Sequence, residues 1–121
     1  MGDDLGKFLP SLRDDFWHSL VDNHADAMLA AHDHLYSRAR GAFGQTWQVI
    51  AGNGGSRLES VVDQASINYF GYTVVRVEGG KRAVLTSYGR DVPVAGYLTS
   101  SSAYPTTVRD RADISWPKAR D

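Results

Sequence analysis

The chain contains no cysteine, so disulfide frameworks and thiolate chemistry are excluded and any protein ligand to a metal must be histidine or a carboxylate. No apolar run approaches the ~20 residues of a membrane-spanning helix, and the acidic first residues do not have the pattern of a signal peptide. We therefore expect no membrane partner and, by default, a cytoplasmic location. An excess of charge is also missing, because 13 basic and 14 acidic residues leave a net charge of −1. This balance gives no support to nucleic-acid binding.

What the chain does contain is typical of a globular protein. Hydrophobic residues make up 42% of the 121 residues and charged residues 22%, which argues against intrinsic disorder. The length predicts a single domain over residues 1–121 that is large enough to bury a core. We expect residues 1–8 and 105–121 to be loosely ordered, and we find no internal repeat.

The apolar spacing predicts an α+β fold, with one helix packed on a mixed or antiparallel β-sheet. Leu12, Phe16 and Leu20 recur at helical spacing after Pro10, which suits the first turn of a helix, so we expect a helix over residues 10–24. Residues 32–45 and the segment from Ser100 onward are expected to be loops. The expected strands are 27–31, 47–51, 69–77 and 82–88, with a hairpin turn at 78–81 and a further edge segment at 92–98.

Two histidines one residue apart, His32 and His34, follow the short apolar strand expected at 27–31. From the end of a buried strand, such a pair can direct both rings at one point or at two adjacent points. Neutral imidazole is the commonest protein ligand for zinc and similar ions. The alternative is that both histidines cap the strand and hydrogen-bond to the backbone of the loop.

The residues around this pair resemble a known family. Residues 16–38, from Phe16 to Arg38, are similar to the last metal-ligand block of the calcineurin-like metallophosphoesterases, which include the purple acid phosphatases. In that block a helix leads into a strand that ends in Gly-His-x-His. Residues 49–55 are similar to the family's strand-then-glycine segment, and residues 69–77 to its closing hairpin. The likeness covers about residues 8–90, in three blocks in the expected order.

The resemblance implies that His32 and His34 each reach a metal in a dinuclear phosphoesterase centre. It also implies that the fold corresponds to the carboxyl-terminal part of a metallophosphoesterase sandwich. The chain departs from the family in two ways. Ala31 stands where the family has glycine, and the family's other metal motifs (Asp-x-His, Gly-Asp, Asn-His and one further histidine) do not precede residue 32.

Three further residues are candidates for the same site, each with a simpler explanation. Arg38 could hold phosphate oxygens with its forked donors, or be a solvated surface charge. Asn53, with the glycines after it, could form a concavity of backbone N–H groups for phosphate, or a tight turn. His24 is the most available third metal ligand, although a histidine is also favoured at the end of a helix by the helix dipole.

These observations lead to a metal-dependent phosphoester hydrolase, reduced to its carboxyl-terminal portion, as the first hypothesis. Its cofactor would be a divalent ion, with zinc expected first and manganese or iron as alternatives, and its substrate a small phosphoester. Catalytic zinc normally has three protein ligands, so two histidines are too few. A homodimer would bring four imidazoles together. The alternative is a non-catalytic fragment, or a metal-binding module that complements a separate chain.

Overall fold

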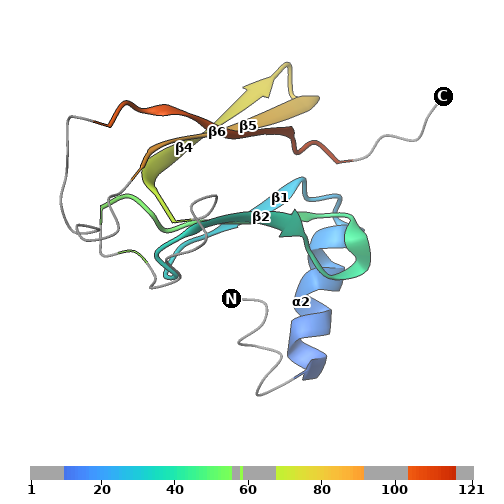
Figure 1. The fold of residues 1–121 in the computed structure, drawn as a ribbon. Coiled ribbons are helices and arrows are strands. Elements are labelled where there is room, and N and C mark those ends of the chain that lie inside the picture. The colour runs from blue at the N-terminus through green and yellow to red at the C-terminus, as the bar shows by residue number, and fades with distance from the viewer. Residues whose placement is uncertain (1–9, 56–57, 59–67, 92–103, 117–121) are drawn as a thin grey trace.

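The structure, a computed structural model, describes residues 10–55, 58, 68–91 and 104–116. These residues form an α-helix, a short 3₁₀ turn and two small three-stranded sheets, one mixed and one antiparallel (Figure 1). The predicted α+β class is therefore confirmed. None of the described helices has the length and hydropathy needed to cross a membrane.

Helix α2 spans Pro10–Asp22, within the predicted range. Its buried residue is Trp17, which is 2% exposed and lies against Gly41, just before the 3₁₀ turn η1 at Ala42–Gly44. A Cβ atom at Gly41 would lie 2.2 Å from the Trp17 ring, so only glycine allows this approach. The helix is thus held by Trp17 and by the stack of His18 on Phe43 of η1 rather than by the whole predicted stripe, and Leu12 is 48% exposed.

The first sheet has the strand order β1-β3-β2. Its strands are β1 (Ala27–Ala30), β2 (Tyr36–Arg40) and β3 (Trp47–Ala51); β1 pairs with β3 in parallel and β2 pairs with β3 antiparallel. The predicted strands at 27–31 and 47–51 are confirmed. The loop expected over 32–45 is wrong for Tyr36–Arg40, because this polar segment becomes a strand through its ladder with β3 rather than through an apolar pattern of its own.

The second sheet is antiparallel, in the order β4-β5-β6. Its strands are β4 (Phe70–Glu78), β5 (Arg82–Arg90) and β6 (Thr107–Asp113). The predicted hairpin of β4 and β5 is confirmed. The expectation of a loose tail from residue 105 is wrong over Thr107–Asp113, which pairs with β5. The expected lead-in at 1–8 and edge segment at 92–98 lie outside the described residues.

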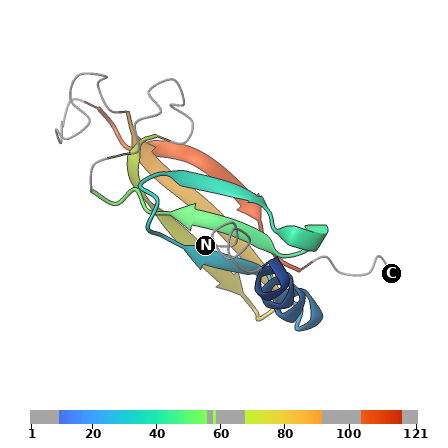
Figure 2. The ribbon, with the colours of Figure 1, turned by 90° about the horizontal axis from the view of Figure 1, so that it is seen from below.

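The core lies between the two sheets. Tyr36 and Val49 of the first sheet meet Leu85 of the second, with Ile114, which follows β6, beside them. Seen from below, the first sheet lies across the second, with β2 on the side of β6 and β1 on the side of β4 (Figure 2). One side of this two-layer arrangement is thus bounded by β2 and β6, and the other by β1 and β4.

Candidate metal and phosphate site

The loop that carries the two histidines lies directly against the segment that follows β3. Because β1 and β3 are parallel, their carboxyl ends reach the same edge of the sheet, and His32 follows one strand as Gly52 follows the other. A Cβ atom at Gly52 would lie 2.0 Å from the carbonyl oxygen of Asp33, so glycine is required there. The predicted ligand loop is therefore in contact with Gly52, the residue directly before the predicted phosphate loop at Asn53.

Backbone hydrogen bonds fix the shape of this loop. The N–H of Leu35 donates to the carbonyl of Asp33 at 2.9 Å, and the N–H of Gly52 donates to the carbonyl of Leu35 at 3.0 Å. His32 has a φ of +89°, in the left-handed region that residues other than glycine rarely adopt. Such a conformation costs about 1–3 kcal/mol and persists only where the surroundings hold it, as at many functional sites. His32 is exposed and His34 half-buried.

The pair does not gain a third ligand within the part of the chain that the structure describes. No group of three or more histidine, aspartate or glutamate side chains in the described residues could hold a metal ion. The donor chemistry of His32 and His34 suits zinc, but their number does not complete a zinc site. A metal centre built on this loop would need further ligands beyond those that the described residues of one chain supply.

His24 is held at the end of the helix by an aromatic contact. Its ring stacks on the indole of Trp116, with 4.7 Å between the ring centroids and 15° between their planes. The backbone N–H of Trp116 donates to the carboxylate of Asp26, just before β1. These contacts join the start of the first sheet to the end of the second and give His24 a structural role beside its predicted role as a ligand.

Arg38 is engaged in an ion pair between the two sheets. Its Nε donates to Oδ2 of Asp110 at 2.7 Å and its Nη2 to Oδ1 at 3.0 Å, while its guanidinium lies 4.6 Å from the centre of the Trp47 ring. The hydroxyl of Tyr36 donates to the same carboxylate at 2.5 Å. A phosphate contact by Arg38 would require this pairing to open.

The contacts among Arg38, Tyr36 and Asp110 change the pKa values of the carboxyl and phenol groups. The hydrogen bonds from Arg38 hold the pKa of the Asp110 carboxyl below its usual range, against a smaller opposing effect of burial. Burial, aided by the neighbouring carboxylate, raises the pKa of the Tyr36 phenol. Sequence reasoning missed Asp110, because 72 residues separate it from Arg38 and no local pattern links the two.

Asn53 is 1% exposed and its side chain is used within the fold. Its Nδ2 donates to the carbonyl of Tyr69 at 2.9 Å, and its own carbonyl accepts a hydrogen bond from the N–H of Gly71 at 3.0 Å. Asn53 thereby joins the end of β3 to the start of β4. Gly54 and Gly55, which follow it, are exposed, so their backbone N–H groups are the accessible part of the predicted phosphate loop.

Comparison with protein-family models, with curated proteins and with solved structures finds no match to this chain. The resemblance to metallophosphoesterases thus depends on the sequence alone, at residues 16–38, 49–55 and 69–77.

Proposed function

We propose that this chain is a metal-dependent phosphoester hydrolase reduced to the carboxyl-terminal portion of a metallophosphoesterase-like sandwich, with its metal centre completed by a second copy. The observation that carries the proposal is the contact between the His-x-His loop and the glycine segment at one edge of the first sheet. The loop that carries the candidate metal ligands thus touches the residue that leads into the candidate phosphate donors, and metal-assisted phosphoester hydrolysis needs such groups close together.

In this proposal each part of the site has a separate task. His32 and His34 hold a divalent ion, zinc first, through neutral imidazole nitrogens. The ion, when bound, lowers the pKa of a water molecule and polarises the phosphoryl oxygen. The exposed backbone N–H groups of Gly54 and Gly55 offset negative charge that develops on the phosphoryl group. Asn53 positions these glycines through its bonds to Tyr69 and Gly71.

The second copy is invoked for two reasons. The first is the number of ligands, because two chains related by a two-fold axis supply four imidazoles. The second is the apolar surface on the side of the molecule bounded by β1 and β4. Leu29, Val75 and Val77 lie on the strand faces that point toward the core, since they pair with the buried Val49, Leu85 and Ala83. Even so, they are 58%, 36% and 67% exposed.

A non-catalytic, metal-binding or complementing module is the second candidate. It is favoured by one observation, namely that Arg38 and Asn53, the two residues predicted to act on phosphate, are both bonded within the fold. In such a module His32 and His34 still bind metal, and the chemistry belongs to another chain.

Hydrolysis of 4-nitrophenyl phosphate by the zinc-loaded protein, with and without a chelator, tests the proposal. We expect turnover that the chelator abolishes and that falls by roughly a hundredfold or more in His32→Ala and His34→Ala, since each removes a ligand. His18→Ala is the matched control, because His18 stacks on Phe43 at 3.9 Å on the exposed face of α2. Metal binding without turnover selects the second candidate, and full activity of the His32→Ala, His34→Ala variant contradicts both.

A further inference from the structure

Only one asparagine of the chain, Asn53, is followed by glycine. Asparagine is among the thermally labile residues, because its side-chain amide can react with the backbone nitrogen of the next residue. Glycine has no Cβ atom to crowd that nitrogen, so an Asn-Gly step is the most reactive of such pairs. How fast Asn53 and Gly54 react therefore depends on how the fold holds them.

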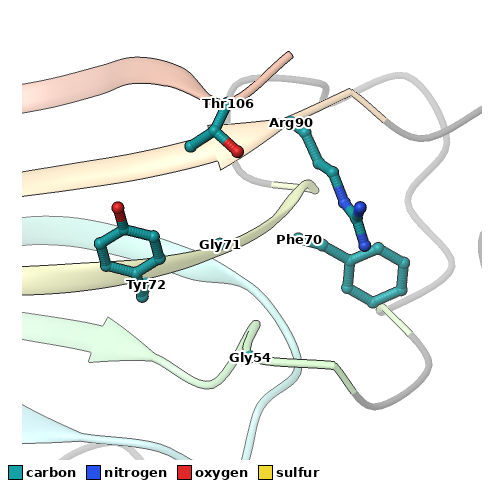
Figure 3. Close-up of a pocket in the computed structure, with 6 residues that line it drawn as sticks. All are labelled: Gly54, Phe70, Gly71, Tyr72, Arg90 and Thr106. Carbon is teal, nitrogen blue, oxygen red and sulfur yellow. The ribbon is translucent and has the colours of Figure 1, made fainter. Parts of the chain in front are cut away.

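The glycine of this pair is open to water. Gly54 is exposed, and a Cβ atom built on it would meet nothing within 4 Å. It lines a pocket of about 220 Å³ at the start of β4, and Figure 3 shows it across this pocket from Gly71 and Tyr72. Water therefore has access to the peptide bond between Asn53 and Gly54 from the glycine side.

The side chain of Asn53, in contrast, is held inside the fold. Asn53 is 1% exposed, and its Nδ2 donates to the carbonyl of Tyr69 at 2.9 Å. Its backbone carbonyl accepts a hydrogen bond from the N–H of Gly71 at 3.0 Å. Deamidation removes Nδ2 as ammonia, so the atom must first part from the Tyr69 carbonyl. The reaction therefore needs the contact between the end of β3 and the start of β4 to open.

We propose that Asn53 is a site of spontaneous deamidation whose rate is set by the opening of this contact. In the open state the backbone nitrogen of Gly54 attacks Cγ of Asn53 and gives its proton to water. The new N–Cγ bond closes a cyclic imide, while the Cγ–Nδ2 bond breaks and ammonia leaves with a proton from the solvent. Water then adds to one imide carbonyl and opens the ring to aspartate or isoaspartate. No group is oxidised or reduced.

The product of this reaction cannot restore the contact. A carboxylate has no N–H to donate to the Tyr69 carbonyl, and its charge is unfavourable in a position that is buried in the folded chain. Isoaspartate also adds a carbon atom to the main chain at the junction of the two sheets. Deamidation of Asn53 is therefore irreversible and weakens this junction, whether or not the chain binds metal or hydrolyses a phosphoester.

Incubation of the full chain in mildly alkaline buffer with a chelator, with and without urea, tests the proposal. Peptide mass spectrometry at successive times separates asparagine, aspartate and isoaspartate at position 53. We expect Asn53 to deamidate in urea, and at least about tenfold more slowly in the folded chain, where the contact is open for only a fraction of the time. Asn23, which is exposed and followed by histidine, is the internal reference and should react at least about tenfold more slowly than Asn53 in urea.

Two neighbouring variants, compared in urea so that folding does not matter, identify the attacking nitrogen. Gly54→Ala crowds this nitrogen and should slow the deamidation of Asn53 about tenfold. Gly55→Ala is the matched control, because it leaves Gly54 in place, and the rate should stay unchanged. Equal rates with and without urea, or equal rates for the two variants, overturn the proposal. Since the measurement is made on residue 53 without metal, failure of the proposed phosphoesterase activity would not affect it.

Discussion

The two sides of the two-layer arrangement differ in how the core is covered. On the side of β2 and β6, Arg38 and Tyr36 of one sheet bond to Asp110 of the other, and the carboxylate is 24% exposed. On the side of β1 and β4, Leu29 and Val77 point toward the interior and yet remain 58% and 67% exposed. A single chain thus seals one side of its core and leaves apolar surface on the other.

This difference indicates where a partner would bind. The outward face of β4 carries Arg76 and Glu78 after the exposed Tyr72 and Val74, and charged residues on an edge strand discourage pairing with another chain. The inward face of the same strand is apolar and has no such protection. The side bounded by β1 and β4, here the open side, is therefore suited to hydrophobic contact with a second copy. The side bounded by β2 and β6, the closed side, is already covered by its own ion pair.

The largest expected effect is the loss of the ion pair on the closed side. Asp110→Ala removes three hydrogen bonds and leaves the charge of Arg38 uncompensated, so the free energy of unfolding should fall by about 2–3 kcal/mol. Urea denaturation followed by circular dichroism measures this change. The matched control is Glu78→Ala on the open side, where Arg76 is 78% exposed, with an expected change below about 0.5 kcal/mol. Equal effects of the two variants would remove the distinction between the sides.

Acid should weaken the closed side selectively. The pKa of Asp110 lies below its ordinary value of about 3.9, so the unfolded state takes up this proton more readily than the folded state. Its contribution to stability is complete above about pH 5 and is lost as the pH falls through the lowered pKa. Asp110→Asn should therefore flatten the dependence of unfolding free energy on pH below about pH 4. An unchanged acid slope would show that the pairing of Asp110 with Arg38 is weak in solution.

Charges placed on the open side should prevent association. The Leu29→Lys, Val77→Lys variant puts two cations on exposed apolar positions, so we expect the dimer Kd to rise at least about tenfold while the fold is retained. Sedimentation velocity over a range of protein concentrations measures this shift. Leu12→Lys, at a 48% exposed position of α2, is the control and should leave association unchanged. The same weakening in both variants would place the contact elsewhere.

The smallest expected effect concerns the stack of His24 on Trp116. His24→Ala should lower the free energy of unfolding by about 0.5–1 kcal/mol, through loss of a contact that joins the two sheets near the helix. Thermal unfolding of the variant and the unchanged protein in the same buffer measures this difference in free energy. Zinc affinity, measured in parallel, separates this role from that of a ligand. A fall in affinity as large as in His34→Ala would restore His24 as the third metal ligand.

Local signals in the sequence account for what could be predicted of the fold. Pro10 and the apolar spacing after it marked α2, and the glycine turn between Tyr69 and Tyr88 marked the hairpin of β4 and β5. The strands β2 and β6 could not be predicted, because their polar residues form strands only through pairing with β3 and β5. Tertiary pairing overrode local preference in both cases.

The candidate site, like the fold, could be predicted only in part from the sequence. The position of His32 and His34 after an apolar strand was visible in the sequence, and the strand is confirmed. Their contact with Gly52 depends on the parallel pairing of β1 and β3, which no local pattern encodes. The engagement of Arg38 by Asp110 could not be predicted either, since a residue 72 positions away supplies the partner.

Native mass spectrometry of the protein, first stripped of metal and then loaded with zinc, tests the central claim most directly. We predict a dimer that retains zinc, and a His32→Ala, His34→Ala variant that retains none at the same zinc concentration. A monomer that still holds zinc would contradict the shared site, and a wild-type chain that binds no zinc would contradict the assignment of His32 and His34 as metal ligands.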